Sequence, residues 1–172
     1  METQHARTRA QLEFVLSNIE PGRSAEYLSK YLESNQIAKD GSGPWIELIG
    51  KAGGPAELTG LLSQASEGGL DDPATVRALQ ALASAQRLQK KRPAGNVGSV
   101  AKLFNADNEA VRLAAIRLAG NWKLDGQVKP LATKAEQGSS SNIRGAAIEA
   151  LREIGKPAVS YTHLTLPTNR EV

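Results

Sequence analysis

Residues 107–120 read DNEAVRLAAIRLAG, and this stretch has the features of a single amphipathic helix. It begins with an N-cap candidate and an acidic residue in the first turn, which complements the positive end of the helix dipole. Apolar residues then recur at helical spacing, and Gly120 follows as a helix stop signal. The stretch therefore predicts one helix with one apolar face.

Two further stretches, residues 72–83 and 141–155, repeat this pattern. In each of the three stretches a β-branched residue directly precedes an arginine, and these residues, Val76, Val111 and Ile143, are 35 and 32 residues apart. A spacing in this range is typical of helical repeat arrays. The sequence therefore predicts an all-α fold, an α-solenoid of stacked antiparallel helix pairs.

The composition agrees with such an array and narrows the possible functions. Hydrophobic residues make up 40% of the 172 residues but aromatic residues only 4%, which suits helices packed through Leu, Ala, Val and Ile. The net charge of +3 is too small to imply a nucleic-acid partner by itself. Because the chain has no Cys, disulfides and thiolate metal sites are excluded for it. No apolar run approaches the roughly 20 residues of a membrane-spanning helix, so no membrane span is predicted.

Clusters of Gly, Ser and Pro and one charge run divide the chain. The charge run at 90–92 is followed by Pro93 and Gly95, which makes it the best linker candidate. We expect an N-terminal helical pair at 1–43, first repeats at 44–89, a linker at 90–95, C-terminal repeats at 96–159 and a tail at 160–172.

The apolar periodicity also predicts which side chains lie between the helix pairs. A short helix cannot bury its apolar face alone, so neighbouring pairs must cover it. The side chains expected to be buried are Leu58, Leu61, Leu79, Val100, Leu103, Val111, Ala115, Ile116, Leu118, Leu131, Ile143, Ala147 and Leu151.

The pattern of Val or Ile, then Arg, then a spaced Leu or Ala in the second helix of each pair resembles short HEAT repeats of the phycobilisome-lyase type. The resemblance covers about residues 44–159. It implies a HEAT-like or armadillo-type superhelix that offers surfaces for interaction rather than chemistry. The spacing is shorter than the usual HEAT length of roughly 40 to 47 residues. Tetratricopeptide and ankyrin repeats have similar periods, but their Trp-Leu-Gly-Tyr set and Thr-Pro-Leu-His run are missing from this sequence.

The order of segments also resembles the helical region of large secreted dehydrogenases from planctomycete-like and verrucomicrobial bacteria, in which helical repeats link a sugar-dehydrogenase-like β-propeller to a c-type cytochrome domain. The residues that carry this resemblance are 45–51 with 55–58, then 76–79, then 107–120. Neither the propeller nor a cytochrome motif occurs in the chain. The resemblance implies only a setting: the partners would be other domains of the same parent chain or another protein, and the compartment would be periplasmic or extracellular.

The end of the chain, residues 159–168, resembles the translation of a common transposase sequencing adapter, and 169–172 would continue it. We therefore expect residues 160–172 to be a non-native tail. The run Ile154-Gly155-Lys156-Pro157-Ala158 parallels residues 49–51 and 55–56, where the next helix begins. The expectation is that the chain is a fragment of a longer reading frame.

No residue pattern predicts catalysis, cofactor binding or a metal site. Of the two histidines, His163 lies in the predicted tail and His5 has no partner at metal-ligand spacing. A Gly-x-Ser-x-Gly elbow, a His-Glu-x-x-His helix and a Walker loop are all missing from the sequence. We expect no enzyme activity of this segment, although a parent protein of the resembled kind would be an oxidoreductase.

Five residues are candidates for interaction or for holding the repeats in line. The recurring Arg77, Arg112 and Arg144 are interpreted as a structural ladder that bonds neighbouring acids or helix C-terminal carbonyls, with a row of binding residues as the alternative. Trp45 and Trp122 are interpreted as packing residues at helix ends, and each is also a candidate anchor for a partner domain.

Two functions follow from these observations. The first is a non-catalytic scaffold that joins or docks domains of a larger bacterial redox protein. The alternative is a nucleic-acid-binding HEAT-like module, for which Arg112, Arg117, Arg144 and the basic run at 90–92 would have to share one concave face. Nucleic acid is disfavoured, because no aromatic residues are interleaved with the basic run for base stacking.

Overall fold

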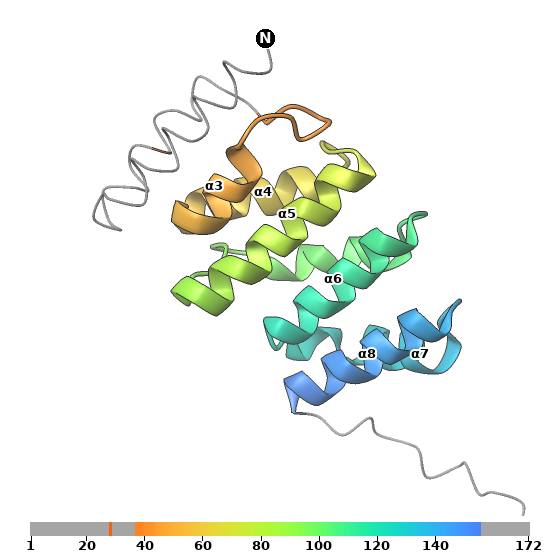
Figure 1. The fold of residues 1–172 in the computed structure, drawn as a ribbon. Coiled ribbons are helices and arrows are strands. Elements are labelled where there is room, and N and C mark those ends of the chain that lie inside the picture. The colour runs from red at the N-terminus through yellow and green to blue at the C-terminus, as the bar shows by residue number, and fades with distance from the viewer. Residues whose placement is uncertain (1–27, 29–36, 156–172) are drawn as a thin grey trace, which may run out of the picture.

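The computed structural model describes residue 28 and residues 37–155 (Figure 1). These residues are helical with short connections and contain no strand, which confirms the all-α prediction for this part of the chain. The expected N-terminal pair and the expected tail fall mostly or wholly outside the described residues. Leu28 is described there and is helical and buried.

The helices follow one another with short loops, as expected for antiparallel neighbours. Their bounds are α3 Trp45–Ala52, α4 Pro55–Ser66, α5 Asp72–Ser84 with the π-helical extension η1 Ala85–Gln89, the 3₁₀ helix η2 Val97–Asn105, α6 Glu109–Asn121, the short 3₁₀ helix η3 Asp125–Gln127, α7 Val128–Gln137 and α8 Ser141–Ile154. The stretch at 97–105 is a 3₁₀ helix of 9 residues, longer than the roughly three or four residues that such helices usually have.

The helices form two layers (Figure 1). One layer contains α3, α5, α6 and α8, and each of these helices contacts the next. The other layer contains α4, η2 and α7, and each of these packs against a helix of the first layer, forming the pairs α4 with α5, η2 with α6 and α7 with α8. Stacked antiparallel pairs in two layers are an α-solenoid, as the sequence predicts.

The predicted linker at 90–95 lies against α4. The backbone N–H of Ala94 donates to Thr59 Oγ1 on α4 at 2.8 Å, and Pro93 is buried. On either side of this segment α4 contacts η2 and α5 contacts α6. Residues 90–95 thus connect two helix pairs that are themselves in contact.

Polar caps set where the second helix of each pair begins. Asp71 Oδ1 accepts the N–H of the third residue of α5 at 2.9 Å, and Asn108 Oδ1 accepts that of the second residue of α6 at 2.8 Å. Ser140 Oγ accepts an N–H of the first turn of α8 at 3.2 Å. Because side-chain caps satisfy amide groups that have no partner within the helix, these starts are fixed locally by the sequence.

The core is a continuous apolar layer between the two helix layers. Of the side chains predicted to be buried, only Leu103 differs, since it is half-buried and packs against the core from its edge. All the others are buried. The close agreement follows because helical periodicity specifies one inward face per helix.

Two glycines that look like helix stop signals in the sequence lie inside helices at crossing points. A Cβ on Gly50 of α3 would lie 2.8 Å from the Cβ of Ala81 on α5. A Cβ on Gly120 of α6 would lie 2.6 Å from the Cα of Ala150 on α8. α3 continues to Ala52 and α6 to Asn121, so both glycines are helical, and Gly120 lies in the last turn of its helix rather than after it. Each glycine allows two helix backbones to approach closely.

We expect Ile116→Ala to lower the free energy of unfolding by about 2 to 5 kcal/mol, because Ile116 is fully buried and its truncation leaves a cavity. Leu88→Ala is the matched control, since Leu88 is 71% exposed and should change stability by no more than about 0.5 kcal/mol. Urea unfolding followed by circular dichroism measures both. An unchanged midpoint for Ile116→Ala would show that our core assignment of α6 is wrong.

Gly120→Ala should lower the free energy of unfolding by about 1 to 3 kcal/mol, because the new methyl group meets the backbone of α8. Gly145→Ala on α8 is the control, since nothing lies within 4 Å of a Cβ built there. That variant should gain about 0.5 to 1 kcal/mol from helix propensity alone. If both variants were stabilised equally in urea unfolding, the close approach of α6 and α8 would be refuted.

Candidate functional site

A groove of about 420 Å³ lies over α6, between α5 and α8. Its volume falls in the range of protein ligand sites, roughly 300 to 1,000 Å³. Three helices of the same layer contribute to it. The lining residues are Val76, Leu79, Gln80, Ala83, Ala110, Leu113, Ala114, Arg117, Leu118, Asn121, Glu149 and Glu153.

The base of the groove is apolar. Leu79 of α5 and Leu118 of α6 are among its lining residues and are each only 1% exposed. Val76, Leu113 and Ala114 are half-buried, so part of each side chain remains accessible along the groove. Apolar surface that is concave and accessible is the usual feature of sites where ligands or partner side chains are buried.

The helical period explains why α6 forms the floor. Its lining residues recur every three or four positions from Ala110 to Asn121, which places them on one face of the helix. The eleven steps between these two residues correspond to about 16 Å along the helix axis at 1.5 Å per residue. Ala110 and Ala114 have short side chains, so this face of α6 projects little into the space between α5 and α8. The groove is thus an elongated channel rather than a closed pocket.

Charged side chains without ion-pair partners border this channel. Glu149 and Glu153 of α8 are exposed, as is Arg117 of α6. Among residues 37–155, none of these three takes part in an ion pair within 4.0 Å or in a side-chain hydrogen bond. Their charges are therefore available to a partner.

Glu153 is placed at the channel by the close helix crossing. A Cβ on Gly120 would lie 3.0 Å from Glu153 Oε2, so the carboxylate of Glu153 lies directly over the backbone of α6. The next residue, Asn121, also lines the groove, and its Oδ1 is buried without a hydrogen-bond donor. Oxygen acceptors therefore collect where α6 and α8 meet.

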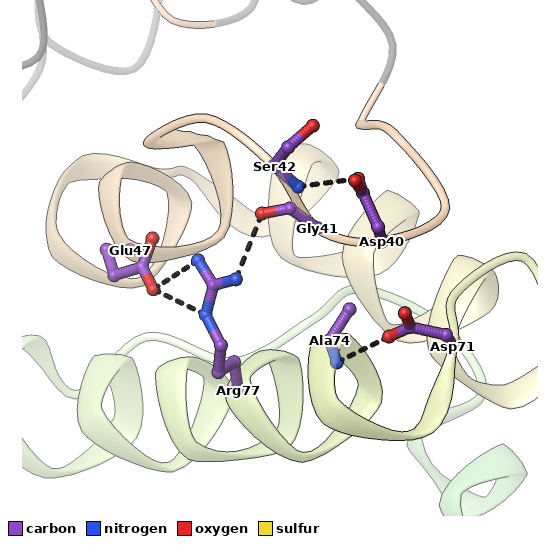
Figure 2. Close-up of polar contacts among 7 residues, drawn as sticks. All are labelled: Asp40, Gly41, Ser42, Glu47, Asp71, Ala74 and Arg77. Carbon is purple, nitrogen blue, oxygen red and sulfur yellow. Dashed lines mark hydrogen bonds and ion pairs between the residues drawn. The ribbon is translucent and has the colours of Figure 1, made fainter. Parts of the chain in front are cut away.

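Arg77 lies away from this groove and ties α5 to α3 (Figure 2). Its Nε and Nη2 donate to Glu47 Oε1 at 2.9 and 2.7 Å, and its Nη1 donates to the carbonyl of Gly41 at 3.0 Å. In the same loop the N–H of Ser42 donates to Asp40 Oδ1 at 2.9 Å, which lowers the pKa of Asp40 below its usual value. Three donors of one guanidinium thus bind two different segments.

Arg112 and Arg144 share a different contact. Arg112 Nη1 donates to the carbonyls of Ala106 at 2.6 Å and Asp107 at 2.8 Å. Arg144 Nη1 donates to the carbonyl of Gly138 at 2.9 Å. Ala106 and Gly138 each lie six residues before the arginine, at the end of the preceding helix of the pair. The contact repeats at the same register, and a ladder role for these arginines stays a proposal.

The two tryptophans differ in exposure. Trp122 is fully buried at the end of α6, so the suggestion that it anchors a partner at the surface is wrong for this structure. Trp45 is half-buried at the start of α3, beside Gly43. A role for Trp45 at an interface stays a prediction.

The basic residues considered for nucleic acid do not gather in the groove. Of that set only Arg117 lines it. Lys91 Nζ donates to the carbonyl of Gly53 at 3.5 Å, and Arg92 Nε donates to Gln86 Oε1 at 2.9 Å.

The lining residues that the sequence analysis did not single out as site candidates include Glu149 and Glu153. Their signal in the sequence is two acids four residues apart on one helix face.

Few kinds of polar side chain line the groove. Its lining contains neither Ser, Thr, Cys, His, Lys nor Tyr, and consists of aliphatic side chains, two amides, one guanidinium and two carboxylates. Among the described residues no group of three or more His, Cys, Asp or Glu is placed to hold a metal ion. No helix of this part of the chain is long and apolar enough to span a membrane.

Replacing Arg77 with Met should lower the free energy of unfolding by about 1 kcal/mol. Charged hydrogen bonds contribute roughly 1.5 to 3 kcal/mol, but the Arg77 and Glu47 side chains are about one-third exposed, so solvent screening reduces the loss. Arg87→Met is the control, because Arg87 is exposed and makes no ion pair or hydrogen bond with the described residues. Equal effects of the two variants in urea unfolding would contradict a structural role of Arg77.

Comparison with known proteins gives one match. A family model described as HEAT repeats matches residues 99–165, which covers most of η2, all of α6, α7 and α8, and the following eleven residues. No curated protein and no solved structure matches the chain significantly. The matched range contains two complete or nearly complete helix pairs and ends beyond the predicted boundary at 159. Residues 99–165 are therefore similar to HEAT repeats, and they belong to a stack with the architecture of an α-solenoid.

Proposed function

We propose that this chain is a non-catalytic helical-repeat scaffold that docks a protein segment in the groove over α6. HEAT repeats in general serve as protein-interaction modules, and part of the chain is similar to them. The observation that carries the proposal is the channel itself, with half-buried apolar side chains at Val76, Leu113 and Ala114 and unpaired charges at its border. Such a combination matches the apolar centre and polar rim of protein interfaces.

The shape of the groove favours a peptide segment. The channel runs about 16 Å along α6, which corresponds to roughly five residues of extended chain or three turns of helix. It is neither an enclosed cavity nor a flat surface, so a partner lying in it would be partly covered. An amphipathic segment that lies in a groove between helices is a common mode of recognition.

The alternative, a nucleic-acid-binding HEAT-like module, has less support. Glu149 and Glu153 border the channel, and carboxylates repel phosphates. Arg112 and Arg144 each use a guanidinium nitrogen to bind backbone carbonyls of their own repeat. The groove also lacks an aromatic side chain on which a base could stack.

We further propose that the scaffold belongs to a larger bacterial redox protein, a dehydrogenase with a c-type cytochrome domain. The support is the resemblance of residues 45–51 with 55–58, 76–79 and 107–120 to the helical region of such proteins. The docked partner would then be another domain of the same parent chain, and the protein would work in the periplasm or outside the cell.

Sequencing of the genomic locus through both ends of this reading frame tests that setting. A β-propeller dehydrogenase region upstream and a Cys-x-x-Cys-His motif downstream would support it. A cytosolic enzyme fused on either side would refute the redox setting while leaving the docking groove to be tested by itself.

With the neighbouring domain from that reading frame purified, we expect Ala110→Trp to weaken its binding at least about tenfold, because Ala110 is exposed in the channel and an indole there would fill it. Lys102→Trp on η2 is the control, since Lys102 is exposed in the opposite helix layer. Isothermal titration calorimetry measures both, and circular dichroism confirms that both variants fold. Equal binding by the two variants would contradict docking in this groove.

A further inference from the structure

We infer that the segment docked in the groove carries a Lys or Arg side chain that binds Glu149 and Glu153 while an aliphatic neighbour packs on the half-buried Val76 and Leu113. This inference rests on the proposed docking function and adds the chemistry of the partner. It follows from three observations on the groove: the spacing of its acids, the place of one carboxylate and the position of its single basic residue.

The first observation is that Glu149 and Glu153 form an unneutralised pair. They lie four residues apart on α8, so both side chains project from the same face of the helix. Like charges at this spacing repel each other, and neither carboxylate has an ion-pair partner among residues 37–155. A cation placed between them would relieve this repulsion.

The second observation is where these oxygens lie. The carboxylate of Glu153 lies over the backbone of Gly120, since a Cβ there would be only 3.0 Å from Oε2. Asn121 follows directly, with its Oδ1 buried and without a donor. The accessible acceptors at this side of the channel are the exposed carboxylates of Glu149 and Glu153, and the side chains with several donors and no acceptor are those of Lys and Arg.

The third observation is that the apolar base lies in the same groove. Val76, Leu113 and Ala114 are half-buried and leave accessible apolar surface in its lining, whereas Leu79 and Leu118 are nearly fully buried. A cationic side chain near such a surface packs its aliphatic stem on the apolar atoms and keeps its charge at the border. Charge pairs at a partly desolvated border are also stronger than pairs in open water.

Arg117 limits the sequence of the partner. It is exposed on α6, within the same channel, and has no ion-pair partner among the described residues. A segment that is basic along its whole length would place like charge against Arg117, and like charges placed together reduce affinity. The partner should therefore be amphipathic, with its basic residue on the α8 side and a neutral or acidic residue opposite Arg117.

Two synthetic peptides test this inference on the full chain. Both have twelve residues, blocked ends and leucines on one helical face. One carries two lysines four positions apart beside that face, and the other carries two glutamates in the same places. We expect the lysine peptide to bind about tenfold more tightly by fluorescence anisotropy, with a preference that weakens as NaCl is added.

Glu149→Gln with Glu153→Gln should remove most of this preference. The control is Glu67→Gln with Glu136→Gln, which changes the net charge equally at exposed positions outside the groove. Circular dichroism confirms folding of both double variants. Equal binding of the two peptides, failure of both to bind at millimolar concentration, or an unchanged preference in the Glu149 and Glu153 variant would each overturn the inference.

Docking of a partner in the groove and the basic chemistry of that partner can be refuted separately. If the neighbouring domain binds and Ala110→Trp abolishes that binding while the peptides show no charge preference, docking in the groove stands and the cationic partner is wrong. If the lysine peptide is preferred and the preference depends on Glu149 and Glu153, but no neighbouring domain binds, the chemistry of the groove stands and the scaffold role is wrong.

Discussion

The structure depends on how closely successive helices of one layer can approach each other. At two boundaries a glycine faces an alanine, Gly50 against Ala81 and Gly120 against Ala150, and backbones come into contact there. At the boundary between α5 and α6 no such pair occurs, and Leu79 and Leu118 fill the space instead. Interaxial distance follows the size of the contact side chains. The groove lies over α6 and is lined from both of its neighbours, α5 and α8, so it spans one boundary without such a glycine and the close crossing at Gly120.

The arginines show that a recurring charged residue can belong to the framework rather than to the site. In the structure Arg112 and Arg144 bind carbonyls at the end of the preceding helix, and Arg77 binds Glu47 and a loop carbonyl. Guanidinium groups suit this task, because several donors in a fixed plane can satisfy carbonyls that helix ends leave unpaired. The charges available for recognition are those outside the repeated register.

Much of the fold could be predicted from the sequence, because helical periodicity and N-caps are local signals. Asp71 and Ser140 cap the helices that the pattern predicts, and nearly all of the predicted core is buried. The groove could not be predicted in this way, since it depends on the spacing between helices distant in the sequence. Gly120 illustrates the limit: a glycine near a helix end indicates a stop, and only the neighbouring Ala150 shows that it is a contact.

Gly120 affects both the packing of the helix stack and the position of a charged group in the groove. The residue has no side chain, so α8 approaches α6 and the carboxylate of Glu153 lies over the α6 backbone at the border of the channel. A larger residue would separate the helices and would also displace this carboxylate relative to Arg117 and Asn121. A change of packing at this crossing is therefore a change of recognition as well, because the protein interior transmits such shifts instead of absorbing them. Glu149, which lies one turn earlier on the exposed face of α8, contributes the same charge without taking part in the crossing.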